Sequence, residues 1–80
     1  MAVKLLFFAQ CSDWMGLGEI NFPLSQPQSL ESFLQGFHHF EPILKNRAML
    51  RVAINRNLSD FNAEIKNNDE IAFLPPSSGG

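Results

Sequence analysis

The two most apolar segments of the sequence lie near opposite ends of its 80 residues. Val3 to Ala9 is an almost continuous apolar run, and Glu70 to Leu74 is a second run, which two prolines follow. A short apolar run bounded by polar residues is typical of a strand that is covered on both faces. Both segments are therefore expected in the middle of one sheet, side by side.

Three further segments have the pattern of strands. Polar and apolar residues alternate in Glu19–Phe22 and in Leu50–Asn55, as they do in strands with one buried face. A turn predicted at Arg56-Asn57 makes Leu58–Phe61 the short returning strand of a hairpin. Asn67-Asn68-Asp69 predicts a second turn before the last strand, because these residue types tolerate unusual backbone angles.

One helix is predicted after a loop from Pro23 to Gln28. Ser29 is a good N-cap residue, and Glu31 lies in the first turn, where the helix dipole favours an anion. The apolar stripe at helical spacing consists of Leu30, Phe33, Leu34 and Phe37. Gly36 weakens this helix, and Pro42 requires that it end by about residue 40. Residues 42–49 are compatible with a second helical turn or with a loop.

A short helical turn is also expected between the first two strands. Ser12 or Asp13 is predicted to cap it, with Trp14 and Met15 inside. Gly16 and Gly18 are expected to end it.

The predicted order is β-β-α-β-β-β, which defines an α+β fold. With the first and last strands adjacent and a helix across one face, this is the β-grasp arrangement of the ubiquitin superfold. We expect a mixed sheet of four to five strands in a single domain, residues 1–76, followed by a flexible tail, residues 77–80.

Composition and charge exclude several classes of function. The single cysteine cannot form an intrachain disulfide, which fits a reducing compartment. The net charge is −2 and the six basic residues are scattered, so a nucleic-acid partner is not expected. No segment approaches the roughly 20 apolar residues of a membrane span, and the N-terminal run is too short for a signal peptide. We therefore expect a cytoplasmic protein without a membrane partner.

Few side chains suggest chemistry of their own. A lone cysteine such as Cys11 can be a nucleophile, but no base is expected near it, and a small half-buried residue is the better interpretation. His38 and His39 are neighbours on a helix end and point about 100° apart, so they do not converge on one metal ion, and Glu41 adds no known ligand spacing. Neither a metal site nor a cofactor site is predicted in this chain.

The C-terminal segment is different. Pro75-Pro76 stops the last strand because proline cannot donate to a sheet ladder, and Gly79-Gly80 follows two residues later. Glycine has no side chain, so such a tail can enter a narrow channel and lie flat in another protein's active site. A frayed terminus is the alternative, but a β-grasp order, a rigid Pro-Pro exit and a terminal Gly-Gly occur together here. The combination favours a functional tail, and the group predicted to carry the function is the terminal carboxyl of Gly80.

The sequence resembles the small, sulfur-carrier subunit of molybdopterin synthase, the MoaD family of ubiquitin-like proteins. The resemblance rests on Lys4 to Gln10, on Val52 to Leu58 and above all on Asn68 to Gly80, and it is weakest from Cys11 to Asn46. Two departures are Asn68-Asp69 where Gly-Asp is usual and Leu74 where phenylalanine is frequent. Neither lies in the Gly-Gly segment.

The resemblance implies a reaction sequence that two partners carry out on Gly80. An E1-like, ATP-using adenylyltransferase of the MoeB type activates its carboxyl group, and sulfur then replaces the adenylate to give a thiocarboxylate. The large synthase subunit, of the MoaE type, accepts the tail in a heterotetramer. Two such sulfurs convert cyclic pyranopterin monophosphate into the dithiolene of molybdopterin. On this interpretation the chain is not an enzyme on its own, and ATP is used by its partner.

A partner surface follows from the alternation of side chains along strands. If Leu5 and Phe7 face the helix, Phe8 faces outward, as do Ala72 and Leu74 on the last strand. With Leu6, Ala53 and bordering Leu58 they form an apolar patch that no predicted element covers, which usually marks an interface. The partner-binding residues expected are Phe8, Leu58, Leu74, Pro75 and Pro76.

Two other functions remain as alternatives for this chain. One is a related sulfur carrier for thiamine synthesis or tRNA thiolation, and the other is a ubiquitin-like protein modifier.

Overall fold

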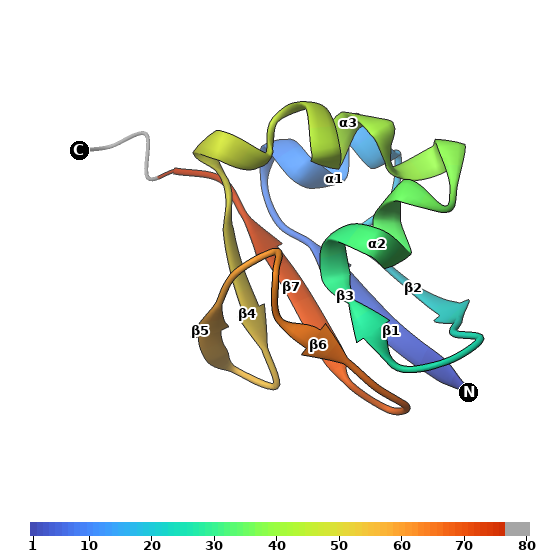
Figure 1. Ribbon diagram of the computed structural model, residues 1–80. Coiled ribbons are helices and arrows are strands. Elements are labelled where there is room, and N and C mark those ends of the chain that lie inside the picture. Colours follow the sequence, from blue (N-terminus) through green and yellow to red (C-terminus); the bar gives the residue numbers. More distant parts are fainter. Residues whose placement is uncertain (77–80) are drawn as a thin grey trace.

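A computed structural model describes residues 1–76 of the chain (Figure 1). Its strands are β1 (Ala2–Phe7), β2 (Glu19–Pro23), β3 (Gln28–Ser29), β4 (Arg51–Ile54), β5 (Asn57–Ser59), β6 (Glu64–Ile65) and β7 (Glu70–Leu74). Its helices are α1 (Gln10–Met15), α2 (Leu30–Gln35) and α3 (Glu41–Lys45), with 3-10 turns η1 (His38–Phe40) and η2 (Arg47–Met49).

The main sheet has the strand order β2-β1-β7-β4-β5. β1 and β7 run parallel, with Leu5 beside Ile71 and Phe7 beside Phe73, and the other neighbours are antiparallel. The prediction that the two most apolar segments lie side by side inside a mixed sheet is confirmed. A second, two-stranded sheet pairs β3 with β6 and was not predicted from the sequence.

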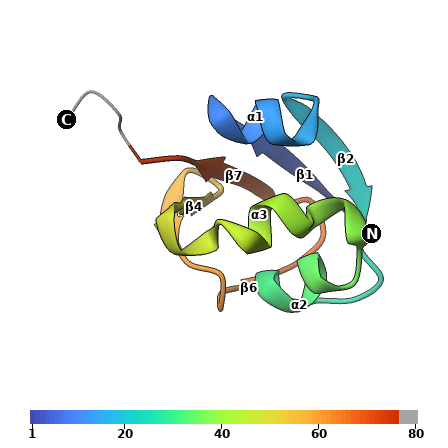
Figure 2. The same ribbon diagram turned by 90° about the horizontal axis from the view of Figure 1, so that it is seen from above.

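The helices all lie over one face of the main sheet, which we call the inner face (Figures 1 and 2). Side chains that point to this face are buried, with Leu5 and Phe73 both 0% exposed. Phe7 and Phe73 stack with their ring centroids 5.5 Å apart. The core therefore lies between the sheet and the helices, and the opposite, outer face is left without a helix.

The predicted long helix is wrong in extent. Ser29 caps α2 as expected, accepting a hydrogen bond from the Ser32 backbone N–H (3.1 Å), but the helix ends at Gln35. Gly36 follows, and glycine favours a helix end over its interior. Pro42 then occupies the first turn of α3, a position where its missing N–H costs nothing. Residues 42–49 thus form α3 and η2, not a loop.

The helical turn predicted between the first two strands begins earlier than expected. Helix α1 begins at Gln10, so Ser12 and Asp13 lie inside it, and the Ser12 hydroxyl donates to the Ala9 carbonyl (2.7 Å) instead of capping the helix. Gly16 ends α1 as expected, with a φ of 78°.

The β4–β5 hairpin turns at Asn55-Arg56, one residue earlier than predicted. The φ angles of these two residues are 52° and 71°. Positive φ at both central residues is typical of the turn whose twist matches a two-residue hairpin. As a consequence β5 spans Asn57–Ser59, not Leu58–Phe61.

Among the helices of residues 1–76, none combines the length and the apolar character that a membrane span requires.

Candidate functional site

The segment that leads to the predicted tail leaves from the middle of the sheet. β7 ends at Leu74 and continues into Pro75, which is half-buried, and Pro76, which is exposed (Figure 1). Proline lacks the N–H that would extend the ladder, so pairing stops at this point. The predicted site residues Gly79 and Gly80, and the predicted flexible tail of residues 77–80, lie outside the described residues.

The outer face carries the apolar row that alternation predicted. Leu6 lies beside Ala72, Ala72 beside Ala53, and Ala53 beside Leu58, across four neighbouring strands. We call this row, together with Phe8 and Leu74 at the tail side, the outer patch. Leu58 is 71% exposed and Phe8 46% exposed, although both side chains are apolar. Helices α2 and α3 lie over the opposite face of the sheet (Figure 2).

Phe8 lies beside the end of β7, where the chain leaves the sheet. Its backbone N–H donates to the carbonyl of Phe73 on β7 (3.2 Å), directly after the last paired residue of β1. The structure therefore brings Phe8, Leu74 and Pro75 to the same end of the sheet. Leu58, on the edge strand β5, forms the outer end of this row.

Cys11 belongs to α1, and its side chain points into the core. Its side chain is completely buried, not half-buried as predicted, and its backbone N–H donates to the Phe8 carbonyl (2.9 Å). Burial raises the pKa of the Cys11 thiol, because the charged thiolate is poorly solvated there. A buried thiol with a raised pKa is a poor nucleophile, which agrees with a packing role.

His38, His39 and Glu41 are exposed on η1 and the start of α3. His38 Nδ1 lies 4.0 Å from a Glu41 carboxylate oxygen, and both side chains are in contact with solvent. Within residues 1–76 no three side chains of the types His, Cys, Asp and Glu are grouped as metal ligands.

A buried carboxylate that the sequence did not reveal lies at the far end of the sheet. Asp69 is 3% exposed, and its oxygens accept from Asn55 Nδ2 (2.9 Å) and from the Lys66 backbone N–H (2.8 Å). Burial alone would raise the pKa of Asp69, but these hydrogen bonds and the nearby Lys66 ammonium outweigh it and lower the pKa. Asp69 therefore stays ionised and joins two turns, and it is not placed for acid–base chemistry.

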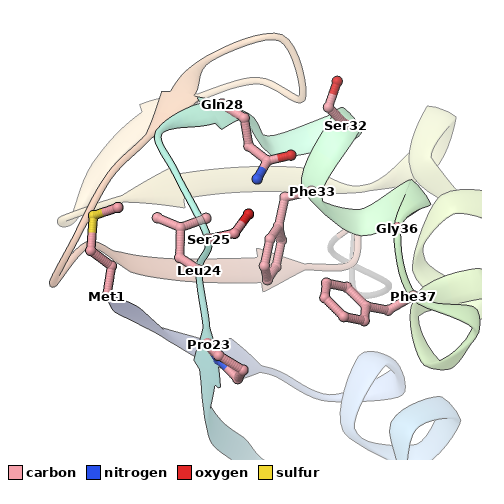
Figure 3. Close-up of a pocket in the computed structure, with 9 residues that line it drawn as sticks. All are labelled: Met1, Pro23, Leu24, Ser25, Gln28, Ser32, Phe33, Gly36 and Phe37. Atoms are coloured by element: carbon pink, nitrogen blue, oxygen red, sulfur yellow. The ribbon is translucent and has the colours of Figure 1, made fainter.

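A cavity of about 410 Å³ lies between α2 and the connection from β2 to β3 (Figure 3). Phe33, Phe37, Leu24 and Met1 supply most of its apolar wall, and its polar lining is limited to Ser25, Ser32 and Gln28. None of these lining side chains is ionisable, so no side chain of the cavity wall can act as a general base for Ser25 or Ser32.

Comparisons with known proteins agree with this geometry. The ThiS family matches residues 5–80, nearly the whole chain. The molybdopterin synthase sulfur carrier subunit of Haemophilus influenzae is 31% identical over 80 residues, which cover 98% of this chain and 99% of the relative.

Two solved structures are similar to the whole chain. SAMP1 from Haloferax volcanii superimposes with a TM-score of 0.80 at 19% identity, covering 100% of both chains, a likeness that supports the ubiquitin-like β-grasp fold. A chain from the complex of subunits 1 and 2 of the molybdopterin-converting factor of Helicobacter pylori has a TM-score of 0.63 at 25% identity, again with 100% of both chains covered. With the family match over residues 5–80, the chain belongs to the ThiS family.

Proposed function

We propose that this chain is the sulfur-carrier subunit of a molybdopterin synthase and that its working group is the carboxyl of Gly80. The observation that carries the proposal is the Pro75-Pro76 exit from the central strand, followed by Gly79-Gly80, in a chain that matches the ThiS family through residue 80. The relative from Haemophilus influenzae, whose name describes this function, supports it over the full length.

The chemistry begins with a carboxylate, which is a poor electrophile. A Gly80 carboxylate oxygen attacks the α-phosphorus of ATP in the MoeB-type partner, pyrophosphate leaves, and an acyl-adenylate forms. A sulfur nucleophile then attacks the acyl carbon, and AMP leaves. The bond between the acyl carbon and the phosphate oxygen of AMP is thereby replaced by a carbon–sulfur bond. The thiocarboxylate that results keeps the sulfur attached to its carrier until the second partner uses it.

The large, MoaE-type subunit then uses the sulfur. Cyclic pyranopterin monophosphate receives two sulfurs, one from each of two carrier turnovers, and becomes the dithiolene of molybdopterin. Gly79 has no side chain and fits a narrow channel leading to the reacting carbonyl. A fully extended segment from Pro75 to Gly80 spans roughly 20 Å, so the partner's active site can lie well beyond the folded domain.

The outer patch is the surface we assign to the large subunit in a heterotetramer. Phe8, Leu58 and Leu74 offer apolar side chains at the side of the sheet from which Pro75 and Pro76 lead away. The structure from Helicobacter pylori, a complex of two converting-factor subunits, supports a partner of this kind. In this proposal the chain is no enzyme by itself, binds no cofactor, uses ATP only through its partner, and works in the cytoplasm.

The test is intact mass after incubation with the activating partner, ATP and a sulfur donor. Wild type is expected to gain the mass difference between one sulfur and one oxygen. Deletion of Gly80 moves the terminal carboxyl back by about 3.5 Å, more than a reaction tolerates when its atoms must approach to about 3–3.5 Å. An extra residue after Gly80 converts the reacting carboxyl into an amide. Both variants should gain nothing.

Reactions without ATP serve as the matched control for mass gained by other routes. Sulfur on the shortened chain, with cofactor synthesis at the normal rate, would contradict the mechanism. A second assay separates the alternative carriers: addition of the large subunit and cyclic pyranopterin monophosphate should consume the thiocarboxylate. A thiocarboxylate that persists there would favour thiamine synthesis or tRNA thiolation, and attachment to lysines would favour a modifier.

A further inference from the structure

Beside its apolar patch, the outer face carries a positively charged residue, Arg51, close to the end of β7 from which Pro75 and Pro76 lead away. Arg51 begins β4, and its neighbour across the ladder is Leu74, the last residue of β7. Val52 points into the core and is 1% exposed, so alternation directs Arg51 to the outer face, where it is exposed. Arg51 and Leu58 also border one shallow depression of about 400 Å³.

Within residues 1–76 the guanidinium of Arg51 forms no ion pair. Lys66 lies 3.5 Å from the Asp69 carboxylate and Arg47 4.0 Å from that of Glu31, whereas no carboxylate of residues 1–76 lies that close to Arg51. Asp60, which borders the same depression, uses one carboxylate oxygen to accept the Asn62 N–H (2.8 Å).

A partner that covers the outer patch also removes the guanidinium of Arg51 from water. A charge removed from water without a counter-ion is costly, so a well-fitting partner supplies one. Guanidinium presents a planar set of N–H donors that matches a carboxylate with two parallel hydrogen bonds. The surrounding apolar side chains would exclude water from such a pair and strengthen it.

We propose that Arg51 is a specificity and positioning residue that binds an Asp or Glu carboxylate on the large subunit. This inference rests on the proposed function, since it assumes that the large subunit docks on the outer face. The ion pair would form one strand away from Leu74, directly before the tail begins, and would thereby fix where the tail enters the partner. In this proposal Arg51 acts on docking and not on the chemistry at Gly80.

The experiment is a titration of the full-length carrier against its large subunit at low and at physiological salt. Arg51→Ala should weaken binding on the order of tenfold at low salt and flatten the salt dependence of Kd. Arg51→Glu should weaken it further, and Arg51→Lys should retain part of the affinity because it keeps the charge without the planar donor set. Arg56→Glu is the matched control, the same charge change on the turn at the opposite end of β4, and should leave Kd within about twofold.

Three outcomes separate the two proposals. Absence of binding by wild type would contradict the proposed function itself. Binding by wild type together with equal Kd values for wild type and Arg51→Glu at low salt would overturn the role of Arg51 alone. An equal loss in Arg51→Glu and Arg56→Glu would do the same, because it would assign the effect to net charge. Unfolding midpoints of all variants should agree, since both positions are exposed.

Discussion

The two faces of the main sheet are built from the same strands but serve opposite purposes. Along β7, Ile71 and Phe73 point to the helices and are 0% exposed, while Ala72 and Leu74 between and after them are half-buried on the outer face. Helices complete the inner face, and no element of residues 1–76 completes the outer one. A residue on the inner face therefore contributes to folding, and its neighbour on the outer face is available to a partner.

The faces also differ in the size of their side chains. On the inner face the rings of Phe7 and Phe73 stack, whereas on the outer face Ala72 lies beside Ala53. We expect the small side chains in the middle, with Phe8 and Leu58 towards the margins, to let a partner's backbone approach closely. Larger residues at these alanine positions would add apolar area but would hold the partner away.

The sharpest test of this contrast compares two neighbours on β7. Phe73→Ala should lower the free energy of unfolding by about 3–5 kcal/mol, because it leaves a cavity in a packed core. Leu74→Ala should lower it by less than about 1 kcal/mol, since the side chain is already partly hydrated. Urea unfolding followed by circular dichroism measures both. Equal losses would mean that the outer face is also part of the core.

The second test compares two exposed phenylalanines. Phe8→Ala should weaken binding of the large subunit by about 2 kcal/mol, as expected for an aromatic anchor, with little change in stability. Phe37 has a similar exposure of 37%, but its ring packs edge-on against Phe22 with centroids 4.7 Å apart. Phe37→Ala should therefore reduce stability and leave binding unchanged. Calorimetric titration together with thermal unfolding detects both effects, and unchanged affinity in Phe8→Ala would remove it from the interface.

Much of the two-faced sheet could be predicted because strand alternation has a simple period. The apolar runs placed β1 and β7 in the centre, and Ser29 correctly marked the start of α2. The same alternation oriented Phe8, Leu74 and Ala53. Arg51 was not singled out from the sequence, because a single arginine carries no signal until its neighbours in the folded sheet are known.

What could not be predicted depends on contacts distant in sequence. The two-residue strands β3 and β6 are too short to show a period and exist only because they pair with each other. Helix α1 lacks a side-chain cap, so its start at Gln10 had no local signal. Asp69 resembled an ordinary turn residue, since nothing in its own segment indicates that Asn55 would hydrogen-bond to it.

The third test concerns the strand register, which decides which side chains lie on each face of the sheet. Asn55 accepts from the Glu70 backbone N–H (2.9 Å) and donates to Asp69 (2.9 Å), which fixes the register of β4 against β7. A slip by one residue would exchange the faces of a strand. Asp69→Asn should lower stability at neutral pH by about 1.5 kcal/mol, because hydrogen bonds to a charged group are lost.

The pH dependence has a definite sign. The pKa of Asp69 is lower in the folded chain than in the unfolded one, so the folded state binds fewer protons between the two values. Its stabilising contribution is complete above the unfolded pKa and is lost as the pH falls through the folded pKa. The difference in stability between wild type and Asp69→Asn should therefore shrink in acid, and a constant difference down to strongly acidic pH would contradict this role.

The smallest effect is expected for the substitution of Cys11, whose side chain lies in the core and not on the outer face. Its thiol is fully buried with a raised pKa, so it should contribute to packing and not to sulfur transfer. Cys11→Ala should cost about 1 kcal/mol of stability, the value typical of a small buried deletion. It should still gain one sulfur in the intact-mass assay, at the rate of wild type. A folded Cys11→Ala that acquires no sulfur would place chemistry inside the core, and the division of labour between the two faces would then be wrong.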